Sequence, residues 1–357
     1  MKIMEIFKKI LALPMLLFVA LLSCSSSENG SEPPKKNTEP DLVINAEVVG
    51  TTTQLPNGNG SGIVNFKISS NSATSFKIVF GDGETLETTT GTFSHTYSAS
   101  GTKTFDMQVS AFNGVKYFNA TKSITIFVAS AQIWADEFDV DGAPNSEKWG
   151  YDLGAGGWGN NEPQYYTNRP ENVIVKGGVL KINTIKENYL GSTYTSARLL
   201  TAGKFAFKYG KVEFRAKLPA GAGTWPALWM LGDNIKTVGW PACGEIDVME
   251  HVGNQLNKIY ATLHHPGHSG ANGDGLTKMI SNATSEFHIY SVDWRADTIK
   301  FYIDNNLFYT FSNSANLPFN QNFFIIINCA IGGNFGGNID PNFTSSTFEI
   351  DYVRVYN

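Results

Sequence analysis

The chain has 357 residues, of which 13% are aromatic and only 17% are charged, and it contains 35 glycines. Its formal net charge of -5 argues against a nucleic-acid-binding protein, which would need a broad basic surface. A chain of this length has room for two domains, and this composition favours β-structure with many turns.

The N-terminus has the pattern of an export signal. Lys2, Lys8 and Lys9 precede the apolar run ILALPMLLFVALLSC, which ends at Cys24. Its last four residues, LLSC, resemble a bacterial lipobox, in which the cysteine carries lipid. We therefore expect a lipoprotein signal peptide over residues 1–23, with Cys24 anchoring the protein to the outer membrane or cell surface. The alternative is an ordinary signal peptide in which Cys24 has no role.

Residues 24–40 continue as SSSENGSEPPKKNTEP after Cys24, with almost nothing to bury. This composition predicts a disordered tether that holds the rest of the protein away from the membrane.

Residues 41–129 contain four short apolar-polar alternations, IVNFKI, SFKIVF, TFDMQVSAF and SITIFV. Strands at this spacing predict a small β-sandwich. The FGDGE turn and the later HTY resemble a polycystic-kidney-disease-type (PKD) domain. Asp82, between two glycines, is expected to form a turn. We expect this domain to be a spacer, with carbohydrate binding as the less favoured interpretation.

Residues 132–357 form the larger predicted unit. GKVEFRAKLP, TIKFYIDNNLFYTF and FEIDYVRVY all alternate with a period of two, and Asp304–Asn306 suits a hairpin turn. No long segment has the spacing of a helix, and no apolar run in the body of the chain is long enough to span a membrane. The sequence predicts an all-β, two-sheet jelly roll with one sheet curved into a cleft.

The run GEIDVMEHVG holds three acids, Glu245, Asp247 and Glu250, within one predicted strand. Glu245 and Asp247 share a face, whereas Glu250 is out of phase unless a β-bulge at Val248–Met249 restores it. With the bulge, two glutamates about 13 Å apart along the backbone can lean together to ~5–6 Å, the separation of a retaining glycosidase. On this reasoning, deleting Met249 would move Glu250 to the opposite face. The alternative is a solvated acidic strand face.

GEIDVMEHVG is similar to the catalytic signature of glycoside hydrolase family 16, in the bulged form of its laminarinase-like members. GWGNNEPQYYT, SARLLT, YGKVEFRAKLP, GTWPALWMLG, TLHHPG and FEIDYVRVY follow in the order typical of the family. The resemblance covers residues 132–357. It implies a β-jelly roll in which Glu245 is the nucleophile, Glu250 the acid/base and Asp247 the carboxylate that assists the nucleophile.

A sugar-binding cleft combines aromatic platforms with polar groups that bind hydroxyls. Trp225 and Trp229, four residues apart, share a strand face, although either could pack in a core. Arg198 could bind sugar or form a structural ion pair, and Trp294 could line the cleft. By the resemblance, the substrate-binding residues are Trp158, Asn161, Glu162, Arg198, Trp225, Trp229, His264 and Asn334, with His264 near the acid/base.

Two metal sites come into question. HHPGH offers His264, His265 and His268, but neighbouring strand residues face opposite ways and no acid cluster follows, so zinc is not expected. The resemblance instead implies a structural calcium ion held by Glu137, the carbonyl of Gly178 and Asp351. The alternative is that these two carboxylates face water or pair with lysine. No cofactor is expected for the chemistry itself.

The resemblance thus implies an endo-acting β-1,3-glucanase that binds β-glucan polysaccharide. We expect a monomer with no nucleic-acid partner. Alternatives are a mixed-linkage β-1,3-1,4-glucanase, an algal galactan hydrolase or, least favoured, a glycan-binding protein without activity. A sulfated galactan would favour basic residues in the cleft, and the candidate segments are neutral or acidic. Cys243 and Cys329 are expected to be buried thiols, although they could form a disulfide.

Overall fold

The computed structural model describes residues 42–357. The signal peptide, the tether and the lipidation site predicted at Cys24 lie outside the described residues. Within residues 42–357, no helix is long and apolar enough to cross a membrane.

The strands of residues 42–128 belong to two sheets. A three-stranded sheet has the order β1–β2–β5, with β1 (Leu42–Val48), β2 (Ile63–Ser70) and β5 (Thr92–Thr96). A four-stranded sheet has the order β4–β3–β6–β7, with β3 (Ser75–Val79), β4 (Thr85–Thr88), β6 (Gly101–Asn113) and β7 (Lys116–Val128). The strands predicted from the four alternating runs are therefore present, while the PKD-like assignment and the domain limits stay predictions.

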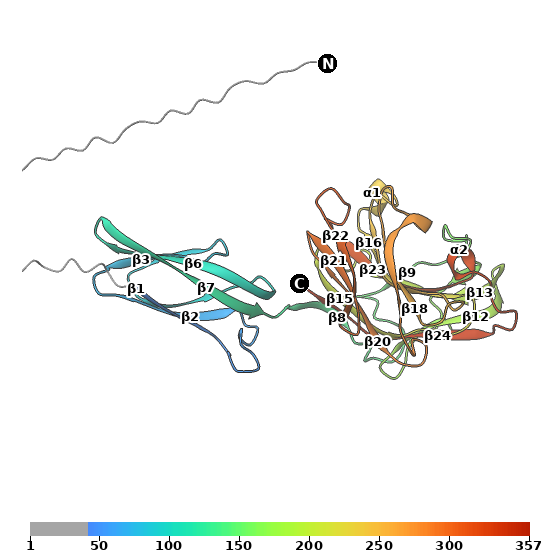
Figure 1. Ribbon diagram of the computed structural model, residues 1–357. Helices are drawn as coiled ribbons and strands as arrows, with labels where there is room; N and C mark the ends of the chain where they lie inside the picture. The colour runs from blue at the N-terminus through green and yellow to red at the C-terminus, as the bar shows by residue number, and fades with distance from the viewer. Residues whose placement is uncertain (1–41) are drawn as a thin grey trace, which may run out of the picture. The chain divides into compact units, whose positions relative to one another are not determined.

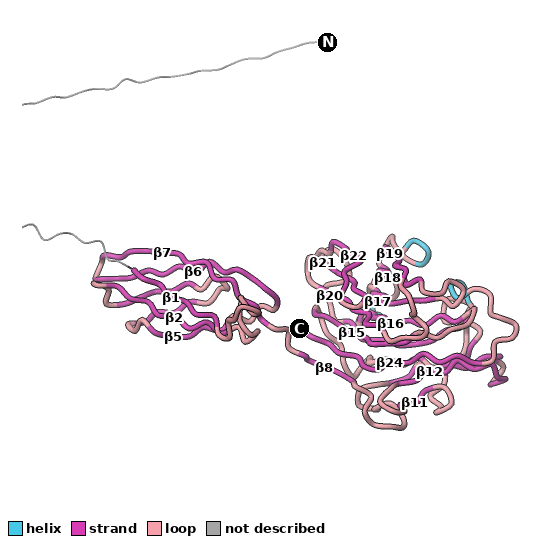
Figure 2. The backbone as a smooth tube through the Cα atoms, turned by 60° about the horizontal axis from the view of Figure 1, so that its bottom comes forward, coloured by secondary structure: helices cyan, strands magenta, loops and turns pink. Residues whose placement is uncertain are grey.

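The strands from residue 132 onward form two larger sheets. The ten-stranded sheet has the order β10–β13–β12–β24–β15–β20–β21–β22, with β11 on β12 and β8 on β24. Figure 2 labels most of these strands, from β22 to β12. Its strands are β8 (Gln132–Asp136), β10 (Gln164–Tyr166), β11 (Val173–Val175), β12 (Leu180–Tyr189), β13 (Ser192–Ser196), β15 (Gly210–Lys217), β20 (His288–Trp294), β21 (Thr298–Ile303), β22 (Asn306–Ser312) and β24 (Ser345–Tyr356).

The seven-stranded sheet has the order β19–β18–β17–β16–β23–β14–β9. Its strands are β9 (Gly150–Tyr151), β14 (Arg198–Leu200), β16 (Thr224–Gly232), β17 (Glu245–His251), β18 (Lys258–His264), β19 (Asp274–Met279) and β23 (Phe323–Ile331). The helical elements in the described part of the chain are single turns, α1 (Ile235–Val238), η1 (Gly270–Asn272) and α2 (Gly333–Gly336). Figure 1 labels α1 and α2.

One hydrophobic core joins these two larger sheets. It includes Val212 and Phe214 from the ten-stranded sheet and Met230 and Ile246 from the seven-stranded sheet, all fully buried. On β15 the buried residues alternate with half-buried charged residues, as the period of two predicts. The predicted all-β, two-sheet architecture is confirmed, and the outer face of the seven-stranded sheet is free to carry polar side chains.

The predicted hairpin after β21 is also confirmed. β21 and β22 are joined by Asp304 and Asn305, whose φ angles of 50° and 63° are both left-handed. Asparagine and aspartate tolerate this conformation better than most residues, and two such residues in succession suit a type I′ turn.

Candidate active site

The bulge predicted in the acidic strand is present. Against β18, Asp247 pairs with Thr262 and Glu250 pairs with Tyr260, so three steps on β17 match two steps on its neighbour. β16 shows the same mismatch, since Asp247 and Glu250 lie opposite Trp229 and Ala227. An extra residue of this kind defines a β-bulge.

The bulge gives the acids and the apolar residues separate faces. Val248 and Met249 are both buried in the core between the sheets, although they are neighbours in the sequence. Glu245 and Glu250 are half-buried on the other face, with the buried Asp247 between them. The predicted common face for the three carboxyl groups is therefore confirmed.

The expected effect of deleting Met249 was wrong. Without the extra residue, Val248 and Glu250 would follow Asp247 directly, and Glu250 would still lie two steps from it, opposite Tyr260. Residues two apart in a regular strand share a face. The bulge therefore accommodates one additional core residue, and removing that residue leaves the three acids together.

Glu245 is held by two aromatic side chains. Trp240 Nε1 donates a hydrogen bond of 2.8 Å to its Oε2, and His264 Nε2 lies 3.9 Å from its Oε1. Burial and then the neighbouring Asp247 raise the pKa of Glu245 well above its usual range, Glu250 adds to this effect, and His264 and Trp240 oppose it. The site therefore retains protons that an exposed carboxylate would release.

Asp247 lies deepest of the three acids, with only 5% of its side chain exposed. His264 Nε2 is 3.2 Å from its Oδ2. Burial, followed by the charge of Glu250, raises the pKa of Asp247, while a hydrogen bond with Glu245 opposes the rise. Asp247 and Glu245 can therefore share one proton.

Glu250 accepts hydrogen bonds from Trp225 Nε1, at 3.0 Å, and from Thr262 Oγ1, at 3.5 Å. Burial raises the pKa of Glu250, and these two hydrogen bonds and His264 oppose the rise. A carboxyl group whose pKa is raised toward the working pH is suited to donating a proton and taking it back.

His264 lies on the predicted face, in register with Glu245 across the β17–β18 pair. Its ring nitrogen is nearest to Asp247 and Glu245. The resemblance had placed it near the acid/base, Glu250, whose pKa it also lowers. His264 thus interacts with all three acids, and its shortest contact is to Asp247.

Arg198 and two tryptophans form a group beside the acids. Its guanidinium carbon lies 4.8 Å from the ring centre of Trp229 and 5.1 Å from that of Trp158. Its Nε lies 2.9 Å from Asp152 Oδ2. The two interpretations of Arg198 are therefore compatible, because an ion pair positions it on the face that carries the acids.

The loop before β10 is tied to α2. Asn161 Nδ2 donates a hydrogen bond of 2.8 Å to Asn334 Oδ1, and the Asn334 amide donates one of 2.8 Å to the Asn160 carbonyl. Two residues predicted to bind substrate therefore contact each other across 173 positions of sequence.

The carboxylate of Glu162 is buried and hydrogen-bonded within the protein. Only 7% of the residue is exposed. Its carboxylate accepts hydrogen bonds from Asn160 Nδ2 at 3.2 Å, Gln164 Nε2 at 2.6 Å and Tyr166 OH at 3.1 Å. Both oxygens are engaged within the protein, so Glu162 orders the loop; sugar contact by this residue stays a prediction.

Trp294 does not line the site. It is fully buried, donates a hydrogen bond of 3.0 Å to the Phe319 carbonyl and packs against Phe207 and Phe323. The expectation for this residue was wrong because alternation along β20 does not reveal which of its two faces points to the core.

Two functional candidates were missed from the sequence. Trp240 lies on the loop before β17, where no strand pattern assigns it a direction. Asn328, on the long apolar strand β23, accepts a hydrogen bond of 2.8 Å from Trp229 Nε1 and donates one of 3.0 Å to Tyr166 OH. A lone amide within FFIIINCAI was an available signal, because a buried polar side chain needs partners.

The segments that carry the three residues predicted to bind calcium lie on or beside β24. Leu180, two positions after Gly178, pairs with Ile350, and Asp136 pairs with Val353. The carboxylates of Glu137 and Asp351 nevertheless form ion pairs with arginines.

Arg354 donates two hydrogen bonds of 2.8 Å to Glu137, and Arg215 donates one of 2.6 Å to Asp351. Calcium would compete with Arg354 for Glu137 and with Arg215 for Asp351, and the calcium site stays a prediction.

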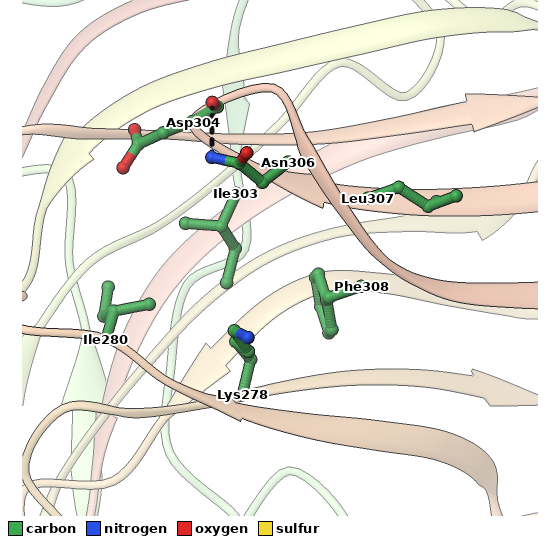
Figure 3. A pocket seen from close by; sticks show the side chains of 7 residues that line it. All are labelled: Lys278, Ile280, Ile303, Asp304, Asn306, Leu307 and Phe308. Carbon is green, nitrogen blue, oxygen red and sulfur yellow. Dashed lines mark hydrogen bonds between the residues drawn. The ribbon is translucent and has the colours of Figure 1, made fainter.

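A separate pocket of about 330 Å³ lies between β19 and the β21–β22 hairpin (Figure 3). The residues that line it include the apolar Ile303 and Phe308 and the charged Lys278 and Asp304. None of the predicted site residues lines it, so it is not part of the candidate active site.

A two-sheet β-sandwich carrying three crowded carboxyl groups and several tryptophans on one sheet face has the architecture of a glycoside hydrolase. Residues 160–354 match the family model described as "Glycosyl hydrolases family 16", and the chain belongs to that family.

Individual relatives agree with this assignment. A β-glucanase of Rhodothermus marinus is 44% identical over 241 residues, which are 63% of this chain and 84% of the relative. The solved laminarinase of R. marinus is 42% identical with a TM-score of 0.62, covering 64% of this chain and 97% of that one. A LamA variant of Z. galactanivorans, solved with laminaritriose and laminaritetraose, is 44% identical with a TM-score of 0.58, covering 63% and 98%.

Proposed function

We propose that this protein is an endo-acting β-1,3-glucanase that cleaves internal bonds of laminarin-type glucans and retains the anomeric configuration. The bulged strand β17 carries this proposal, because it places Glu245, Asp247 and Glu250 on one face. Similarity to a laminarinase and to an enzyme solved with laminari-oligosaccharides supports the substrate class.

Glu245 is the proposed nucleophile. It attacks the anomeric carbon and expels the rest of the glucan chain, which gives a covalent glycosyl-enzyme. Trp240 and His264 stabilise its ionised form by a hydrogen bond and by charge. The proton held in common with Asp247 moves toward Asp247 as Glu245 attacks, which assists the nucleophile.

Glu250 is the proposed acid/base. It gives its proton to the departing glycosidic oxygen and then takes a proton from the water that hydrolyses the intermediate. Trp225 and Thr262 hold its two oxygens, so the carboxyl group is fixed in orientation through both steps.

The proposed binding surface for the sugar rings combines the group around Arg198 with Trp225, Asn161 and Asn334. Trp158, Trp225 and Trp229 offer aromatic rings to the apolar faces of glucose, and Arg198, Asn161 and Asn334 offer hydrogen bonds to hydroxyls. A panel of purified β-glucans and galactans with product analysis tests the linkage preference. Faster cleavage of a galactan than of laminarin would contradict the proposed substrate.

Azide rescue tests the catalytic roles. Glu245→Ala should lose activity and regain it with azide, giving a glycosyl azide of inverted configuration. Glu250→Ala with azide should give the retained configuration, since azide intercepts the covalent intermediate. Asp247→Asn should reduce turnover less than either substitution. An inverted product from the wild-type enzyme would contradict the mechanism.

We also propose that the protein is exported as a lipoprotein through Cys24 and that residues 41–129 act as a spacer. The basic start and the LLSC sequence support the first proposal. Cys24→Ala should release the protein from membranes or stall its processing, and a soluble, fully processed wild type would contradict lipidation. A chain without residues 41–129 should retain hydrolysis of the polymer.

A further inference from the structure

The HHPGH sequence forms a tight turn at the end of β18. The amides of His265 and His268 each donate a hydrogen bond to the other's carbonyl, at 2.8 and 2.9 Å. Their rings stack with centres 4.7 Å apart and an interplanar angle of 21°. The turn therefore presents two imidazoles side by side, while His264 points to the catalytic acids on the other face.

Asp274 completes this group. It is the first residue of β19, which returns alongside β18 and pairs Asp274 with Leu263. Its Oδ2 lies 2.9 Å from His265 Nε2 and its Oδ1 lies 3.1 Å from His268 Nδ1. The sequence argument against a metal here was wrong on this point, since the acid lies on the returning strand.

These three side chains have the spacing of metal ligands. Zinc binds nitrogen and oxygen at about 2.0–2.2 Å, so neighbouring ligand atoms in a tetrahedral site lie roughly 3.3 Å apart. One ligand atom from each residue lies within 4.8 Å of the others. Small rotations of the side chains would bring them onto three corners of a tetrahedron.

We propose that His265, His268 and Asp274 bind a divalent transition-metal ion of the zinc class, with water in the fourth position. Two imidazoles favour such an ion over magnesium or calcium, which prefer oxygen ligands. The side chain of His265 is 7% exposed, whereas His268 and Asp274 are 51% and 31% exposed. One ligand is thus fixed, and two face the solvent from which an ion enters.

His265 is held by its surroundings as a preorganised ligand should be. Its ring lies 5.8 Å from that of Phe319 and 6.0 Å from that of Phe311, and both contacts restrict its rotation. Nε2 of the His265 ring faces Asp274, so the packing and the carboxylate fix the same ring orientation.

The ion would secure the loop that covers His264. A Cβ added at Gly273, next to Asp274, would lie only 2.6 Å from His264 Cε1, which shows how closely this loop packs on the ring. Binding would join the two ends of the loop, at His265 and Asp274, beside the histidine that contacts Asp247. The alternative is a hydrogen-bonded cluster that binds no ion.

Calorimetric titration with Zn²⁺ tests the proposal. The full chain is first freed of metals with a chelator and then titrated in buffer that contains excess Mg²⁺. We expect one equivalent to bind, with affinity at least about tenfold lower in His268→Ala and Asp274→Asn. His288→Ala is the matched control, because His288 also contacts an aspartate, Asp304 at 2.7 Å, and should leave binding unchanged.

Cobalt gives an independent readout on the unmodified protein. Co²⁺ in a four-coordinate site has a strong visible absorption that hydrated Co²⁺ lacks, and Zn²⁺ should displace it. Absence of Zn²⁺ binding, or binding unaffected by both variants, would overturn the proposal. Loss of binding in Glu245→Gln instead would place the ion among Glu245, Asp247 and His264, and would also overturn it.

Discussion

Deleting Met249 should leave the enzyme folded, less stable and active. In the structure, Asp247 and Glu250 lie opposite Thr262 and Tyr260, about 6.8 Å apart along the strand direction at ~3.4 Å per residue. After deletion, two residues cover that span in the ordinary extended geometry. Val248 then fills the core position, and Glu250 stays opposite Tyr260.

The cost of the deletion is the loss of a buried side chain. Met249 is fully buried in the core, and removal of such a methionine side chain costs about 2–5 kcal/mol. For a domain of this size, 1 kcal/mol corresponds to roughly 2–4 °C, so the melting temperature should fall by about 4–20 °C.

Two variants serve as references. Met249→Ala loses the same side chain and keeps the bulge, so its melting temperature should fall similarly. Glu250→Ala removes the acid/base and should lower activity by about 10²–10⁴-fold on substrates with poor leaving groups. Activity is measured as reducing ends released from laminarin below the melting transitions, and folding by circular dichroism.

The deletion variant should then resemble Met249→Ala in activity. A folded deletion variant as inactive as Glu250→Ala, beside an active Met249→Ala, would refute the register argument. That result would mean that the bulge itself orients the acid/base.

Three further expectations can be checked directly. The raised pKa of Glu250 means that the folded chain keeps a proton which the unfolded chain releases above the ordinary value of 4.5. This carboxyl therefore destabilises the fold as pH rises, and Glu250→Gln should raise the melting temperature at pH 7 but not at pH 4. Trp225→Phe removes a hydrogen bond that lowers the pKa of Glu250, so the alkaline limb of the pH–activity profile should move upward; an unchanged limb would contradict this. If calcium binds at Glu137 and Asp351, chelation should lower the melting temperature without abolishing turnover, and loss of turnover in a folded chelated enzyme would place calcium in the active site.

The acidic strand could be predicted in detail because its signal is local. Alternation of acids with apolar residues fixes two faces, and the break at Val248–Met249 can be resolved only by a bulge if both are to be buried. The hairpin at Asp304–Asn305 is equally local, since two residues determine the turn.

The remaining features depend on pairing between distant segments. Asp274 meets His265 only because β19 returns antiparallel to β18 in one register. The ion pairs of Glu137 and Asp351 likewise join residues 217 and 136 positions apart. Trp240 lies on a loop, where the sequence period gives no direction. These features depend on the register between distant segments, which local alternation does not encode. The acidic strand β17 could be predicted because its pattern is local.

The two cysteines in the described residues can report local opening of the structure. Cys243 and Cys329 are free and fully buried, and burial raises the pKa of their thiols to about 11 and about 12. A thiol reagent reacts with the exposed thiolate, so neither should be modified while the sheet stays closed. Cys243 lies just before β17 and Cys329 within β23. The labelling rate of Cys243 would therefore report local opening beside β17, and that of Cys329 would report opening at β23. Neither measurement needs a change to the sequence.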